Sequence, residues 1–177
     1  GDWSSDVCSS DLTMALMCQV VLVTGVLYAM GARDACVKYP SFHPLLLTMA
    51  TGLTGAMLTG DLFNLFVFVE LLVISATVLT ASSDNKAGVE AAYKYFYISQ
   101  LAAIMLLLAN GCLYASAGTL NLADLSQRIA EQSDQALVRI AMVLLLGAFS
   151  IKCAAVPFHF WQPDFHTTSP TAVSAML

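Results

Sequence analysis

Charged side chains are scarce in this sequence, and their scarcity excludes most classes of soluble protein. They make up 11% of the 177 residues, against roughly 25% in ordinary soluble domains. Only seven residues are lysine or arginine, and they do not gather into a basic patch, so nucleic acid is not an expected partner. Hydrophobic residues reach 58%, and the mean hydropathy is +0.75. This composition indicates a protein that crosses a membrane several times.

Cysteine is also uncommon, and its spacing does not indicate a bound metal or cofactor. No two cysteines form a C-x-x-C pair; Cys18, Cys112 and Cys153 lie in apolar runs, whereas Cys8 and Cys36 do not. We expect the first three to be small buried apolar residues, with no disulfide framework. A metal cluster of His159, Asp164 and His166 is conceivable, but no cysteine or second acid near them has ligand spacing. We therefore expect no metal and no cofactor.

The first twelve residues, GDWSSDVCSSDL, differ from the rest of the chain. They are polar, lack helical periodicity and do not begin with Met, and from Asp2 onward they resemble the translation of a sequencing-library adapter. We therefore expect residues 1–12 to be an artefactual tail that has no place in reasoning about the fold. Without its three aspartates, the net charge changes from −5 to −2. Residues 13–177 are then expected to be a partial membrane domain of a longer protein.

Long runs with little or no charge predict an all-α, polytopic transmembrane bundle. About 20 apolar residues allow a helix to cross about 30 Å of hydrocarbon. The sequence predicts five full spans and the start of a sixth, with a short amphipathic surface helix within 116–135. The predicted spans are Thr13–Gly31, His43–Thr59, Leu62–Ala81, Tyr93–Ala115 and Ala136–Val156, and the sixth begins at Thr171. We expect Asp61 to cap the third span.

The third span carries a single charged residue, Glu70. It lies eight positions after Leu62, which is about 12 Å along the helix and near the bilayer centre. A charge at that depth is costly, so the acid must be paired, protonated, or both in turn. Glu70 therefore either handles protons or is a structural residue hydrogen-bonded to a neighbouring helix. We favour the first interpretation.

A second buried charge, Lys152, lies in the fifth span shortly before Pro157. Snorkelling to the interface explains many lysines near helix ends, but this sequence stays apolar for several residues after Lys152. Pro157 has no N–H and cannot bond the carbonyl of Cys153, which predicts a broken helix with a free carbonyl beside the lysine. With His159 and His166 nearby, we expect this region to form part of a hydrophilic path.

The two buried charges suggest a mechanism for proton transfer. Within ion-pair distance, Glu70 and Lys152 each favour the charged form of the other, and when they separate Lys152 can release a proton. Lys94, at the start of the fourth span, is a candidate third member of the path. An interfacial anchor explains its position equally well.

Several motifs together resemble one family. They are GDLFNLFVFVELL, then AAYKYF opening the next helix, then SIKCAAVPFHFWQPD followed by SPTAVSAML. These motifs are similar to those of the proton-conducting antiporter family, which includes the large subunits of Mrp-type sodium/proton antiporters. The antiporter-like membrane subunits of respiratory complex I and of membrane-bound hydrogenases also belong to it. The resemblance covers residues 13–177, and the first motif is most similar to the D-type subunit of the Mrp antiporters.

The resemblance implies a complete protein of about fourteen helices with two inverted repeats, each containing a broken helix. Residues 13–177 would run from the third helix to the start of the eighth. Glu70 matches the family's acid on the fifth helix, Lys94 matches the lysine that opens the sixth, and Lys152 matches the lysine on the broken seventh. The implied location is the inner (plasma) membrane, which the chain would cross several times.

Two functions are compatible with these residues. The first is a component of a multisubunit Na⁺/H⁺ antiporter, a secondary transporter and not an enzyme, in which the Glu/Lys pair carries protons. The alternative is a proton-pumping component of an NADH:quinone oxidoreductase or a membrane-bound hydrogenase, with the redox cofactors on partner subunits. Either function implies other membrane subunits, protons, monovalent cations and the lipid bilayer as partners. The ordered buried charges argue against a purely structural bundle.

Overall fold

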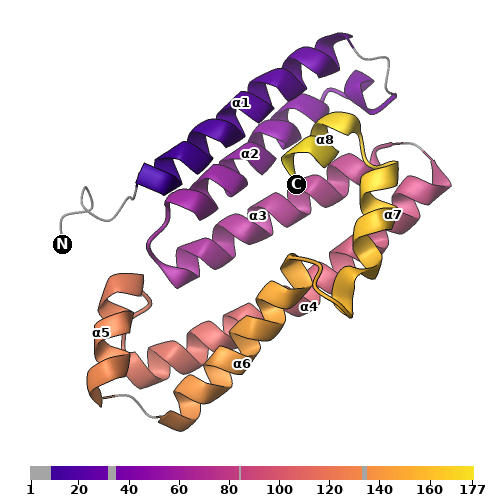
Figure 1. Ribbon diagram of the computed structural model, residues 1–177. Helices are drawn as coiled ribbons and strands as arrows, with labels where there is room; N and C mark the ends of the chain where they lie inside the picture. Colours follow the sequence, from indigo (N-terminus) through magenta and orange to yellow (C-terminus); the bar gives the residue numbers. More distant parts are fainter. Residues whose placement is uncertain (1–8, 32–34, 84, 133–134) are drawn as a thin grey trace.

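The computed structural model describes residues 9–31, 35–83, 85–132 and 135–177, and these ranges are helical apart from short turns (Figure 1). No strand occurs in them, only one isolated β-bridge. The elements are α1 Ser9–Gly31, η1 Ala35–Lys38, α2 Phe42–Leu58, α3 Leu62–Ala81, α4 Lys86–Ala117, α5 Leu122–Gln132, α6 Gln135–Lys152, η2 Phe158–Phe160, α7 Trp161–Thr168 and α8 Thr171–Met176. The prediction of an all-α fold is therefore confirmed.

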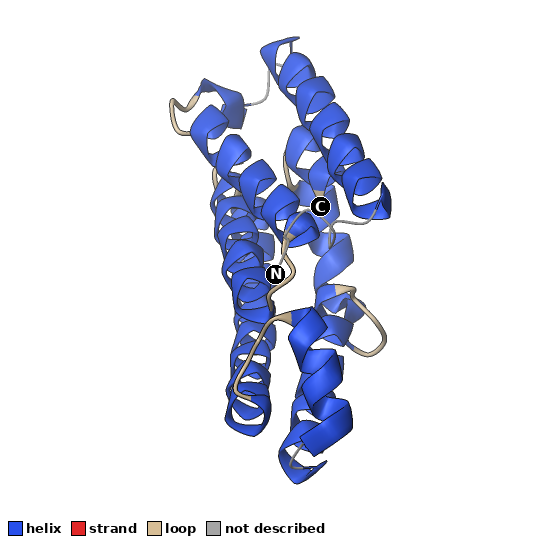
Figure 2. Cartoon of the chain, turned by 90° about the vertical axis from the view of Figure 1, so that its left-hand side faces the viewer, coloured by secondary structure: helices blue, strands red, loops and turns tan. Residues whose placement is uncertain are grey.

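The long helices pack side by side, with α4 at the junction of two groups (Figure 1). On one side, α1, α2 and α3 form a layer, and α3 packs against α4. On the other side, α6 runs along α4. The short α7 returns to α4, and α8 fits against α1 and α3. Figure 2 shows from the side that the long helices share nearly one direction, as expected of a membrane bundle.

In the part of the chain that the structure describes, three helical stretches are long and apolar enough to cross a membrane, by length and composition: Ser10–Gly31, Leu62–Ala81 and Lys86–Ala117. The apolar α2 is shorter, and α6 lies alongside α4. Large apolar side chains cover the outer faces of these helices; Leu16, Val143 and Leu146 are 65%, 69% and 71% exposed. Such surfaces are costly in water and suit lipid. The chain is therefore a multi-pass membrane protein.

The predicted span boundaries agree best with the observed helices where polar residues mark the ends of a span. The third span coincides with α3, and α5 occupies the predicted amphipathic segment. The fourth span was predicted to start at Tyr93, but α4 begins at Lys86, because Asn85 caps it by accepting the N–H of Gly88 at 2.5 Å. At the N-terminal side, α1 begins at Ser9, so residues 9–12 of the predicted tail form the start of the first helix. Residues 1–8 of that tail lie outside the described residues.

Two turns at one end of the bundle pair with each other and fix the start of α3. Asp61 caps α3 as predicted, accepting the N–H groups of Phe63 and Asn64 at 2.9 and 3.0 Å. Asn121 caps α5 in the same way, and the two capping residues form the antiparallel bridge. The backbone bonds of this bridge are Leu62 N–H to Leu120 O, 3.0 Å, and Leu122 N–H to Gly60 O, 2.9 Å. The helix that carries Glu70 is thus tied to the loop after α4.

Gly52 brings α2 into backbone contact with α3. A Cβ added at Gly52 would stand 2.8 Å from Phe68 O and 2.8 Å from Leu72 N. Backbone atoms cannot rotate aside, so α3 itself would have to move. Because Glu70 lies between residues 68 and 72, Gly52 sets how closely α2 approaches the turn that carries the buried acid.

Gly52→Ala should therefore destabilise the complete protein, by about 1–3 kcal/mol, which is the usual cost of overpacking. Gly111→Ala is the control, because a Cβ there meets nothing within 4 Å. It should leave stability unchanged or raise it slightly, since alanine favours helix. Thermal unfolding in detergent measures both. Equal midpoints for the two variants would contradict the close approach of α2 and α3.

Candidate functional site

Glu70 and Lys152 lie opposite each other inside the bundle. Glu70 is on α3 and Lys152 ends α6, and their side chains are only 16% and 21% exposed. Glu70 Oε1 lies 3.9 Å from Lys152 Nζ. Glu70 Oε2 accepts a hydrogen bond from Gln100 Nε2 at 3.0 Å. The two predicted residues, far apart in sequence, are therefore brought together, with an amide from α4 beside them.

The gap between the two charges is too long for a hydrogen bond. Donor and acceptor atoms in a direct hydrogen bond lie about 2.7–3.2 Å apart. Glu70 Oε1 and Lys152 Nζ are both buried and have no hydrogen-bond partner within the described part of the chain. A movement of about 1 Å would close the pair, and a similar movement outward would separate it. The two charges are therefore close enough to attract each other, but they do not form a hydrogen bond.

The helices that carry the charges are not held tightly to each other. The backbones of α3 and α6 each run close along α4 and not close along each other. Side chains of the two helices still share apolar clusters, such as the one in which Phe66 packs with Ala148 and Ile151. The distance between Glu70 and Lys152 can therefore change without breaking an extensive helix interface. This is the geometric requirement for a pair whose spacing controls a proton.

The break in the helix comes earlier than predicted. The span predicted to reach Val156 ends at Lys152, because the backbone leaves the helix at Ala154, whose φ is +51°. Ala155 N–H bonds Ser150 O at 2.9 Å and Ala154 N–H bonds Ile151 O at 3.2 Å, the pattern of a Schellman motif. Cys153 lies beyond the helix end and is exposed, not buried as predicted, whereas Cys18 is buried and Cys112 is intermediate.

The early break changes the environment of Lys152. Its ammonium now stands at the C-terminal end of α6, where the helix carries a partial negative charge that favours a cation. The carbonyl of Ile151 also accepts the indole N–H of Trp161 at 3.3 Å, so the side chain of Trp161 covers the end of the helix.

Aromatic packing holds the segment after the break against α4. The ring of Tyr95 lies 4.9 Å from that of Trp161 and 4.4 Å from that of Phe165. Phe165 is fully buried in this packing. Residues 165–168 complete α7, since Ser169 and Pro170 end the helix. This packing sets the position of the broken segment relative to α4.

Lys94 is placed away from the buried pair, in a half-exposed ion-pair cluster. Its ammonium contacts Asp164 Oδ2 at 2.8 Å and Glu90 Oε1 at 2.9 Å, and its side chain is 41% exposed. Thr167 and Thr168 join these residues around a hollow of about 180 Å³. Lys94 therefore links α4 to α7, at the surface end of the segment that follows Lys152.

The two candidate histidines do not contact the pair. His159 is exposed in η2. His166 Nδ1 lies 2.8 Å from Ser174 Oγ and joins α7 to α8. Within the ranges that the structure describes, no three His, Cys, Asp or Glu side chains form a group that could hold a metal ion. The alternative of a metal cluster at His159, Asp164 and His166 thus finds no support there.

Gln100 is the residue of the site that was not predicted from the sequence. It is a polar amide near the middle of α4, next to Ser99 and followed by the apolar run from Leu101 to Ala109. The available signal was the cost of an amide in a membrane helix, which favours a polar partner on another helix. Another amide on α4, the buried Asn110, donates to Leu62 O at 3.2 Å and supports the start of α3.

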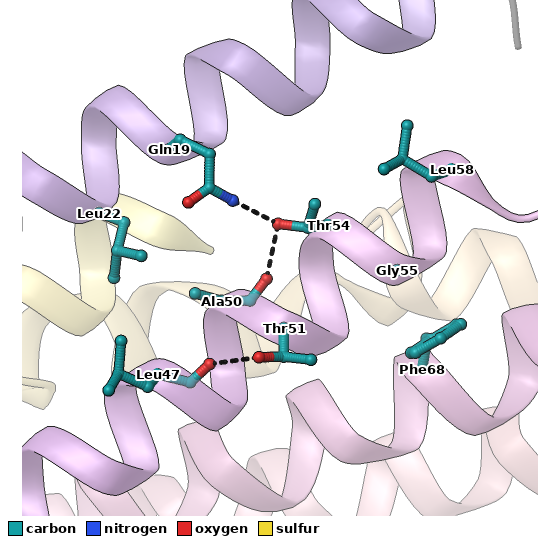
Figure 3. A pocket seen from close by; sticks show the side chains of 9 residues that line it. All are labelled: Gln19, Leu22, Leu47, Ala50, Thr51, Thr54, Gly55, Leu58 and Phe68. Atoms are coloured by element: carbon teal, nitrogen blue, oxygen red, sulfur yellow. Dashed lines mark hydrogen bonds between the residues drawn. The ribbon is translucent and has the colours of Figure 1, made fainter.

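A larger hollow of about 410 Å³ lies on another side of α3, between α1, α2 and α3 (Figure 3). Phe68 lines it, and the side chain of Phe68 lies about 200° around the helix from that of Glu70. Across this hollow, Gln19 Nε2 donates to Thr54 Oγ1 at 2.8 Å, and Thr54 donates to Ala50 O. The lining is mainly apolar, with three uncharged polar residues, and carries no charge. The hollow is therefore separate from the charged site.

These features define a class: a multi-pass helical membrane protein with a buried acid–lysine pair beside a broken helix. Residues 59–177 match the NADH:quinone oxidoreductase/Mrp antiporter transmembrane family, and the chain belongs to that family. The family predicted from the sequence motifs is thereby confirmed.

The relatives come from both branches of the family. The D-type subunit of the Na⁺/H⁺ antiporter of Bacillus subtilis is 38% identical over 128 residues, which are 72% of this chain and 26% of that protein. The N-type subunit of the NADH-quinone oxidoreductase of Desulforudis audaxviator is 39% identical over 137 residues, 77% of this chain and 27% of that protein. A chain of the Mrp complex of Dietzia sp. DQ12-45-1b matches with a TM-score of 0.76 at 30% identity, covering 94% of this chain and 30% of that one. The chain thus spans less than a third of these relatives.

Ala154→Gly should stabilise the complete protein by up to about 1 kcal/mol, because glycine adopts a positive φ without the cost that a Cβ imposes. Ala155→Gly is the control, because Ala155 does not have a positive φ. It should be neutral or destabilising, since it only adds freedom to the unfolded chain. Thermal unfolding in detergent measures both. A lower midpoint for Ala154→Gly than for Ala155→Gly would contradict the left-handed helix end.

Proposed function

We propose that this chain is part of the proton-translocating membrane subunit of a multisubunit monovalent cation/proton antiporter, located in the plasma membrane. The observation that carries the proposal is the buried Glu70–Lys152 pair, whose charged atoms lie 3.9 Å apart on two helices that both pack on α4. Relatives named as D-type subunits of Na⁺/H⁺ antiporters support it, as does the likeness to a chain of an Mrp complex. The protein is a transporter component and not a catalytic enzyme.

In the proposed mechanism, the spacing of the pair determines where a proton resides. When Glu70 and Lys152 approach, the carboxylate and the ammonium stabilise each other and Lys152 keeps its proton. When they separate in a medium of low polarity, the ammonium loses that stabilisation and passes its proton to the next group of the path. Return of Glu70 restores the affinity of Lys152 for a proton. Cation movement elsewhere in the complex would drive the separation.

Lys94 has a more peripheral part in this proposal. Its cluster with Glu90 and Asp164 lines a hollow at the surface end of α7, where protons can exchange with water. His159 and His166 flank the same broken segment and are weaker candidates for the path. We further propose that residues 13–177 correspond to the third to the start of the eighth helix of the complete protein, with residues 1–12 outside its native sequence.

A second candidate function is that of a proton-pumping component of a redox complex. Relatives named as N-type subunits of NADH-quinone oxidoreductases are as similar to this chain as the antiporter subunits are. The same charge pair would serve, with electron transfer on partner subunits driving the separation. Vesicles containing the complete complex distinguish the two: an antiporter moves protons in response to a sodium gradient alone. A redox pump requires an electron donor and acceptor.

In the complete protein, Glu70→Gln and Lys152→Ala should each abolish proton-coupled transport, because each removes one of the two charges. Glu70→Asp should retain partial transport, since it keeps the carboxylate and retracts it by one methylene. Proton flux in vesicles measures the rates, and the amount of assembled complex is measured alongside. Asp124→Asn and Lys86→Ala, which change exposed charges on α5 and α4, are the controls and should transport normally. Normal flux in Glu70→Gln or Lys152→Ala would overturn the mechanism.

A further inference from the structure

Gln100 lies on the helix that both charge-bearing helices share. Its amide donates to Glu70 Oε2 at 3.0 Å, while the other carboxylate oxygen faces Lys152. Gln100 is on α4, against which both α3 and α6 pack. The hydrogen bond therefore ties Glu70 to the common support and not to the helix that carries its charged partner.

This position matters because Glu70 has few other groups to stabilise its charge. Lys152 faces it from α6, and from α4 the buried phenol of Tyr95 is close enough to feel its charge. The only ionisable side chain on α2 is His43, in the first turn, and α8 has none. Among the described residues, Glu70 Oε1 has no hydrogen-bond partner. When Lys152 withdraws, the Gln100 amide is the donor that remains.

An amide suits this task because it cannot titrate. Gln100 offers the same N–H to Glu70 at every pH and in both positions of Lys152, whereas a lysine or histidine in its place would add a second variable charge. A hydrogen bond to an ionised group is also stronger than one between neutral groups. Gln100 can thus set the protonation of Glu70 in the separated state without carrying a proton itself.

We propose that Gln100 is a positioning residue for proton transfer: its hydrogen bond from α4 holds the Glu70 carboxylate toward Lys152 and keeps it ionised when the two charges separate. This inference rests on the proposed function of the pair. It adds a fixed third member to a site that the sequence motifs describe by its charges alone.

The test compares Gln100→Leu with the unaltered complete complex in vesicles, recording proton-coupled transport across a range of pH. Leucine is similar in size but has no donor. The pH of half-maximal transport should move upward by about one unit, because losing a hydrogen bond to a charged group favours the protonated carboxyl. Gln100→Asn keeps the amide but is one methylene shorter, and should give a smaller shift. Should Gln100→Leu not assemble, Gln100→Met, which keeps an unbranched side chain, replaces it.

Gln19→Leu is the matched control, because Gln19 also bonds a neighbouring helix through its amide but contacts Thr54, outside the charged site. It should leave the pH profile unchanged. A purely structural role for Gln100 would lower the amount of complex or the rate without moving the profile, and that result would overturn the proposal. Glu70→Gln is measured in parallel. If it transports normally, the function of the pair is wrong; if it is inactive and the profile of Gln100→Leu is unshifted, only the role of Gln100 is wrong.

Discussion

The attraction between Glu70 and Lys152 across a 3.9 Å gap is the interaction on which the proposed function depends. An isolated charge at membrane depth costs about 2.5–3.5 kcal/mol on insertion scales, so neither residue is tolerated there without compensation. In this protein, a different group compensates each of the two charges. Glu70 receives a hydrogen bond from Gln100, and Lys152 stands at the negative end of α6. Each charge therefore has a support that does not depend on closing the gap between the two.

The rest of the fold holds the helix of Glu70 and the segment around Lys152 in different ways. The start of α3 is held by the Asp61 cap, by the bridge to Asn121 and by the amide of Asn110. Its middle is held by the backbone contact at Gly52. By contrast, α6 ends at Lys152 in a turn, and the chain continues through short segments that pack on α4 by aromatic contacts. The two charges are therefore carried by elements that are held in different ways on the same central helix, α4.

The sequence predicted what depends on local composition. Span lengths follow from apolar runs, the Asp61 cap follows from its place before such a run, and Glu70 and Lys152 stand out because charge is rare around them. It did not predict what depends on tertiary contact. Nothing local pairs Gln100 with Glu70, or Lys94 with Asp164 seventy residues away. The helix break was attributed to Pro157, whereas the turn is made at Ala154, a residue whose own preference does not favour a positive φ.

Difference infrared spectroscopy of the complete protein tests the central claim most directly, because protonated carboxyl groups absorb separately from carboxylates. Spectra recorded at low and high pH should contain a carboxyl band that is absent in Glu70→Gln and altered in frequency or in pH dependence in Lys152→Met. That outcome would establish that the Glu70 carboxylate and the Lys152 ammonium stabilise each other, which is what the mechanism requires if their spacing is to control the proton on Lys152. A band set identical in the unaltered protein and both variants would contradict the account, since Glu70 would then neither take up a proton nor respond to its partner.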